Sequence, residues 1–117
     1  MEIRILKSYI LRFLPGRFGL KYECISRRRN IHKSKLKFDA VVRNLSKNSV
    51  VLDLGANRGK YTSILSCKAG KVIAFEPDSL AFEILQGAVK NCSNVHLENA
   101  AVSNYSGTST MYRRDNI

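Results

Sequence analysis

Two short segments of the sequence carry residue types that suit the binding of a nucleoside with an anionic group. The first is a G-x-x-x-G loop from Gly55 to Gly59, preceded by the acid Asp53, and the second ends in the carboxylate of Glu76. Glycines permit a sharp turn and a close ligand approach, and the free N–H groups of a helix that starts after such a loop attract an anion. An acid about 20 residues farther on accepts hydrogen bonds from ribose hydroxyls. Together the segments predict one site for an anionic group and a ribose.

The loop departs from two familiar phosphate-binding patterns. A dinucleotide fingerprint would need glycine where the chain has Asn57 and Lys60, and a P-loop would need Gly-Lys followed by Ser or Thr. The spacing alone is a weak signal, which Glu76 strengthens. The alternative role for Glu76 is to cap a helix that begins near Ser79, although Asp78 and Ser79 can already do this.

The hydrophobic pattern places both segments at the ends of predicted strands. Runs of branched apolar residues predict strands at 50–54, 71–75 and 94–98, and amphipathic spacing predicts helices at 58–69 and 79–91. Alternation of this kind gives an α/β fold, a Rossmann-like open parallel sheet with the local strand order 3-2-1. Ligands bind beyond the carboxyl ends of such strands, which is where both segments lie.

Three further elements are expected outside this core. Apolar spacing predicts a helix over 36–46 and a short basic amphipathic helix over 3–14, while 106–112 alternates like a strand or hairpin arm. In the simpler interpretation, the helix over 3–14 packs on the domain or on a partner segment. The alternative is weak contact of residues 1–14 with a membrane surface.

The net charge of +11 is concentrated in the first part of the chain. Residues 1–49 hold 13 basic and 3 acidic side chains, whereas residues 50–117 hold 7 and 6. We therefore expect a basic, partly helical N-terminal leader (1–37) before the domain (38–117). Aromatic residues are not interleaved in its basic run, so we expect no nucleic-acid partner.

The three cysteines form no C-x-x-C pair and predict neither a disulfide framework nor a metal site. No secretory signal and no apolar run of membrane-spanning length is present in the sequence. We expect a cytoplasmic protein, and the sequence leaves its oligomeric state open.

On four blocks the sequence resembles the class I S-adenosylmethionine-dependent methyltransferases, and among them the FkbM group. The matching blocks are residues 51–59 with Tyr61 and Thr62, residues 72–78 with Phe82, residues 99–103, and Gly107. The resemblance covers roughly residues 38–113 and implies part of the class I methyltransferase fold, with S-adenosyl-L-methionine as cofactor.

The resemblance implies roles at the methionine end of the cofactor. Gly55, Ala56, Asn57 and Gly59 would surround that end, and Asp53 would orient the loop. The family pattern also includes Tyr61 and Thr62. The alternative for Tyr61 is that it is a residue of the hydrophobic core.

The adenosine end would be held from the next two strands. Glu76 would bind the ribose diol, Pro77 and Asp78 would flank the adenine, and Asn99 with Ala100 would border the adenine edge.

FkbM relatives methylate hydroxyl groups, so the resemblance implies a small-molecule or glycan acceptor. No residue is identifiable as the catalytic base, and neither His32 nor His96 is a candidate. Since related enzymes are considerably longer, we interpret residues 38–117 as a truncated cofactor-binding domain. The alternative is a non-catalytic nucleotide-binding or interaction module derived from a methyltransferase.

Overall fold

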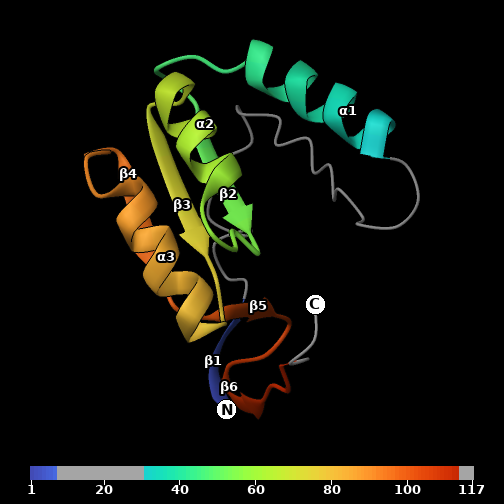
Figure 1. Cartoon of the computed structure of the whole chain (residues 1–117), viewed down its shortest axis with the longest axis vertical. Coiled ribbons are helices and arrows are strands. Elements are labelled where there is room, and N and C mark those ends of the chain that lie inside the picture. Colours follow the sequence, from blue (N-terminus) through green and yellow to red (C-terminus); the bar gives the residue numbers. More distant parts are fainter. Residues whose placement is uncertain (8–30, 114–117) are drawn as a thin grey trace.

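The computed structural model (Figure 1) describes residues 1–7 and 31–113. These residues form two three-stranded sheets and the helices that accompany them. In chain order the elements are β1 (Glu2–Lys7), α1 (Ile31–Arg43), β2 (Val50–Leu54), α2 (Lys60–Lys68), β3 (Lys71–Phe75), α3 (Ser79–Val89), β4 (Val95–Glu98), β5 (Ala101–Ser103) and β6 (Gly107–Thr110).

The first sheet confirms the predicted parallel arrangement. Its strand order is β2-β3-β4, with Val51 opposite Val72 and Ala74 opposite Leu97. β3 is the central strand, and its residues Val72, Ala74 and Phe75 are buried, as expected for an apolar strand between two parallel neighbours. β2 lies at one edge of this sheet, and its end residues Val50 and Leu54 are exposed.

Both crossover helices pack on one face of the parallel sheet. Val72 and Ala74 of β3 are fully buried and pack against these helices. Leu65 of α2 belongs to the cluster around Val72, and Leu85 of α3 belongs to the cluster around Ala74. Figure 1 shows the two helices side by side over the sheet. The predicted helices at 58–69 and 79–91 are therefore confirmed within two residues.

Local capping explains where these helices begin. The carboxylate of Asp78 accepts hydrogen bonds from the backbone N–H groups of Leu80 (2.9 Å) and Ala81 (3.0 Å), which are left free by the first turn of α3. Of the two predicted caps, Asp78 fulfils this role. α2 instead begins after Gly59, which has a φ of 84° and offers no side-chain cap.

The second sheet contradicts the helix predicted over 3–14. Residues 2–7 form strand β1, which pairs parallel with β5 and antiparallel with β6. Residues 8–14 lie outside the described part of the chain. The apolar residues near the N-terminus also alternate as a strand requires, and pairing with distant segments selects that conformation. An amphipathic membrane-surface helix is thus wrong for residues 2–7, whereas the strand expected within 106–112 is confirmed as β6.

The helix predicted over 36–46 begins earlier and ends earlier, as α1. The expected boundary between residues 37 and 38 therefore falls inside a helix, and residues 2–7 belong to a sheet with residues 101–110. Among the described helices, none has the length and apolar character needed to cross a bilayer.

Candidate functional site

The glycine loop after β2 is fastened to the end of the neighbouring strand. The backbone N–H groups of Gly55 and Ala56 both donate to the carbonyl of Phe75, at 2.9 and 3.0 Å. Gly55 and Asn57 have φ values of 78° and 53°, in the left-handed region that glycine and asparagine tolerate best. The loop therefore turns sharply over the carboxyl end of β3, as its glycines predict.

Glu76 lies directly against this loop, although it is 21 residues from Gly55 in the sequence. Its Oε2 accepts a hydrogen bond from the backbone N–H of Asn57 at 2.7 Å, and its Oε1 accepts one from the N–H of Asp78 at 2.9 Å. The side chain is 7% exposed. The two predicted segments thus meet at one place, and the carboxylate links the loop to the start of α3.

Asp53 lies in β2, just before the glycine loop and near Glu76. Its Oδ2 accepts a hydrogen bond from the hydroxyl of Thr62 at 2.6 Å, and Thr62 is fully buried. Burial raises the pKa of Asp53; the hydrogen bond from Thr62 opposes this effect, and the nearby Glu76 carboxylate adds to it. The hydrogen bond joins the end of β2, just before the loop, to the first turn of α2.

The two glycines of the loop have different surroundings. A Cβ added to Gly55 would meet nothing within 4 Å, so the backbone is open on that side. A Cβ added to Gly59 would lie 2.8 Å from Leu85 Cδ1 and 3.2 Å from Ala88 Cβ. The absence of a side chain at Gly59 therefore allows the close approach of α3.

The residues expected at the adenosine end also gather here. The Asn99 side-chain amide donates to the carbonyls of Glu76 (2.8 Å) and Pro77 (3.4 Å), and Ala100 is fully buried beside them. Asp78 adds an ion pair to its capping role, because Arg113 donates to both of its carboxylate oxygens at 2.7 Å. The hydrogen bond from Arg113 is the main reason that the pKa of Asp78 is lowered.

Contacts from the second sheet border this end of the site and were missed in the sequence. Besides the Arg113 pair, Arg4 of β1 forms an ion pair with Glu98, and the Ser79 hydroxyl lies 3.3 Å from the sulfur of Met1. Hydrogen bonding to His96, with the added charge of Arg4, lowers the pKa of Glu98. Nothing in the local pattern could reveal these contacts, since they join residues 35 to 94 positions apart.

Tyr61 is placed differently from the other predicted residues. Its ring centroid lies 4.5 Å from that of Phe38 in α1, and the residue is 49% exposed. The ring thus joins α1 to α2 and stays accessible on the surface. Its location is neither the core nor the contact set around Glu76.

Comparison with known proteins supports the fold and identifies relatives. No family model matches the chain. It is 43% identical over 68 residues to rRNA adenine N-6-methyltransferases of Bacillus licheniformis and Bacillus anthracis, a match that covers 57% of this chain. The chain spans about a quarter (24%) of the length of these curated relatives.

Solved structures give the same result for the fold. A Streptococcus mutans protein described as a methyltransferase, in complex with S-adenosylhomocysteine, is 30% identical, with a TM-score of 0.56 over 63% of this chain and 42% of that one. An rRNA methylase of Streptococcus thermophilus has a TM-score of 0.54 at 23% identity, over 64% of this chain and 45% of that one, and so supports the fold alone.

These findings correct one expectation. We expected a small-molecule or glycan acceptor and no nucleic-acid partner, whereas the curated relatives are named for the methylation of adenine in rRNA. The FkbM group, the cytoplasmic location and the individual binding roles stay predictions. By fold and by sequence likeness, the chain is related to the class I S-adenosylmethionine-dependent methyltransferases, with rRNA methylases among its relatives.

Proposed function

We propose that this chain binds S-adenosylmethionine at the carboxyl ends of β2 and β3, as the cofactor-binding part of a methyltransferase that acts on adenine in RNA. The observation that carries the proposal is the hydrogen bond of 2.7 Å between the N–H of Asn57 and Glu76 Oε2. Because this contact joins the glycine loop to the acid, both motifs face a single ligand. The S. mutans relative with bound S-adenosylhomocysteine supports the choice of cofactor.

The residues present suit this cofactor. The backbone at Gly55 is open, and the first turn of α2 lacks a side-chain cap, so its N–H groups are left for a carboxylate. The contacts of Glu76 use one acceptor position on each oxygen, and each oxygen has a second position for a ribose hydroxyl. Asp53 and Thr62 would hold the loop in place from below.

S-adenosylmethionine supplies an activated methyl group, so the main task of the protein is to position the acceptor. Glu76 would fix the ribose, and Asn99 would keep the ends of β3 and β4 together through the carbonyls of Glu76 and Pro77. Adenine in RNA is proposed as acceptor from the names of the curated relatives. The charge of +11 favours a polyanionic partner.

Isothermal titration with S-adenosylhomocysteine tests the cofactor site in the full chain. Glu76→Gln removes the negative charge from the group that would accept the ribose hydroxyls. A hydrogen bond to a charged group contributes about 1.5–3 kcal/mol, so the variant should bind about tenfold to a hundredfold more weakly. Glu83→Gln is the matched control, because Glu83 is an exposed acid on α3. Equal affinity of the two variants for S-adenosylhomocysteine would show that Glu76 does not bind the ligand.

Transfer of a radiolabelled methyl group from S-adenosylmethionine to total rRNA tests the acceptor. After digestion to nucleosides, label in N6-methyladenosine would support the proposal. Label in sugar hydroxyls instead would contradict the adenine acceptor while leaving the cofactor site intact.

A further inference from the structure

Charge is divided unevenly between two parts of the fold. Residues 37–71, which include most of α1 together with β2 and α2, hold seven basic and two acidic side chains. Residues 72–113, which form α3 and the remaining strands other than β1, hold two basic and four acidic side chains. One side of the molecule is therefore suited to a polyanion, and the other is not.

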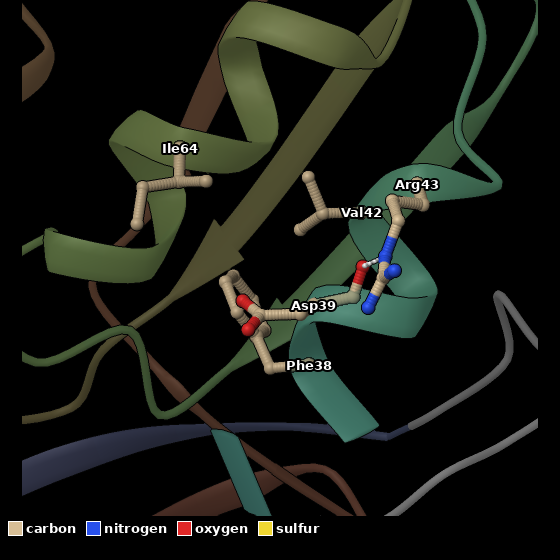
Figure 2. A pocket seen from close by; sticks show the side chains of 5 residues that line it. All are labelled: Phe38, Asp39, Val42, Arg43 and Ile64. Carbon is tan, nitrogen blue, oxygen red and sulfur yellow. Dashed lines mark hydrogen bonds between the residues drawn. The ribbon is translucent and has the colours of Figure 1, made fainter. Parts of the chain in front are cut away.

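A groove of about 300 Å³ lies between α1 and α2 on the positive side. Figure 2 shows Val42 of α1 and Ile64 of α2 facing one another across it, with the guanidinium of Arg43 at the α1 side. Ile64 is 41% exposed, so the groove has an accessible apolar wall. Its lining residues are Phe38, Asp39, Val42, Arg43 and Ile64.

Two further cationic side chains lie near the C-terminal end of α2. Lys68 lies four residues after Ile64 and therefore on the same face of α2. Lys47, from the loop after α1, reaches the end of α2, where its Nζ donates to the carbonyls of Cys67 (3.1 Å) and Ala69 (3.5 Å). Among the lining residues Asp39 is the acidic one.

An exposed aromatic ring lies at the other end of α2, in contact with the groove-lining Phe38. Tyr61 lies seven residues, about two turns, before Lys68 and therefore on the same face of α2. Its ring is half exposed and contacts the ring of Phe38. The ammonium of Lys60 lies 5.8 Å from the ring centroid. Single-stranded nucleic acids bind to surfaces on which an accessible aromatic ring lies beside cationic side chains, because a base stacks on the ring.

We propose that the groove, together with the adjoining surface of α2 that carries Lys60, Tyr61 and Lys68, binds single-stranded RNA. The cations contact phosphates, and a base stacks on the Tyr61 ring. The inference rests on the proposed function, since it names the surface that holds the RNA whose adenine is methylated. The basic run of the sequence lacks interleaved aromatic residues, but the fold supplies one from α2.

Fluorescence anisotropy with a labelled single-stranded oligoadenylate, measured over a range of salt concentrations, tests the groove in the full chain. The double variant R43Q/K68Q should weaken binding and reduce the slope of log K against log salt by about 0.7 for each lost phosphate contact. Lys90→Gln is the control. Lys90 is, like Lys68, an exposed lysine at the end of a helix, but it lies in the part of the fold with an excess of acidic residues. The control should bind as the unmodified chain does.

Stacking is tested separately at Tyr61. Tyr61→Leu keeps an apolar contact with Phe38 but removes the stacking ring, and should weaken binding about tenfold with an unchanged salt slope. Tyr61→Phe keeps the ring and should bind normally. Far-UV circular dichroism and titration with S-adenosylhomocysteine confirm that each variant is folded.

The outcomes separate this inference from the proposed function. If the chain binds RNA and R43Q/K68Q binds it with the same affinity as Lys90→Gln, the groove is not the RNA-binding surface, whereas the proposal of an RNA acceptor stands. If the chain binds S-adenosylhomocysteine but no RNA, both the groove and the RNA acceptor are overturned and the cofactor site stands. Binding to phosphatidylserine vesicles that depends on Arg43 and Lys68, without binding to RNA, would assign the groove to a membrane and overturn the inference.

Discussion

The two sheets of this chain are held together in different ways. The parallel sheet joins segments that follow one another, and its central strand is buried under two helices, with Val72 and Ala74 fully covered. The sheet β5-β1-β6 joins segments about one hundred residues apart, and most of β6 is exposed. Surface ion pairs such as Arg113 with Asp78 connect it to the rest. The first sheet should therefore supply the stability, and the second should shape one border of the candidate site.

The strongest test of this difference compares two truncations to alanine. Leu85→Ala removes a fully buried side chain from the cluster over the parallel sheet and should cost about 2–5 kcal/mol of unfolding free energy. Ile3→Ala, which truncates a half-buried side chain of β1, should cost roughly half as much. Urea unfolding followed by circular dichroism measures both. Equal losses would show that the second sheet belongs to the same core.

The next test concerns the tight contact between α2 and α3. Gly59→Ala would place a Cβ 2.8 Å from Leu85 and would also require a left-handed alanine, so we expect a loss of about 2–3 kcal/mol. Gly87→Ala meets nothing within 4 Å in α3 and should stabilise the chain by up to about 1 kcal/mol. Thermal melting measures both variants. A stable Gly59→Ala variant would mean that α3 does not constrain the loop.

Asp78 connects the two regions, because it caps α3, which packs on the parallel sheet, and pairs with Arg113, which follows β6. Asp78→Ala loses the cap of α3 and the Arg113 pair, and should cost about 0.5–2 kcal/mol, whereas Arg113→Ala should cost about 0.2–1 kcal/mol. Since the pKa of Asp78 is lowered on folding, its contribution is present above 3.8, the unfolded value, and is lost as the pH falls through the folded value. Denaturation at a series of pH values should show this loss in the parent chain and not in Asp78→Ala.

The smallest expected effect concerns Asp53. Because burial raises its pKa, the ionised form carries a cost in the folded state that appears as the pH rises above the ordinary value of 3.8. Asp53→Asn keeps an acceptor for the Thr62 hydroxyl and should be slightly more stable than the parent near neutral pH, with no difference in acid. It should also bind S-adenosylhomocysteine more weakly. A less stable variant at neutral pH would show that the carboxylate itself holds the loop.

Local patterns in the sequence were sufficient for the parallel sheet and for the two ends of the site. Continuous apolar runs identify β2 and β3, and the left-handed turn at Gly55 follows from its residue type. The meeting of Asn57 with Glu76 follows from topology, because the carboxyl ends of neighbouring parallel strands lie at one edge.

The errors have a different physical origin. Strand β1 was predicted as a helix because its apolar spacing fits both periods, and its partners, residues 101–103 and 107–110, decide between them. The contact of Gly59 with Leu85 depends on how two helices approach, which no pattern within either helix records. The acceptor class was misjudged because it was taken from the resemblance to the FkbM group, whereas the curated relatives are named for the methylation of adenine in rRNA.

The pairing of Ile5 with Ala101 and of Glu2 with Thr110 has a consequence for the growing polypeptide. On the ribosome the parallel sheet can assemble as soon as β4 emerges, since its strands are neighbours in time as well as in space. The N-terminal strand must wait, without its partners, until residues 101–110 have been synthesised. Until then β1 is a bare strand that chaperones or other nascent chains can bind.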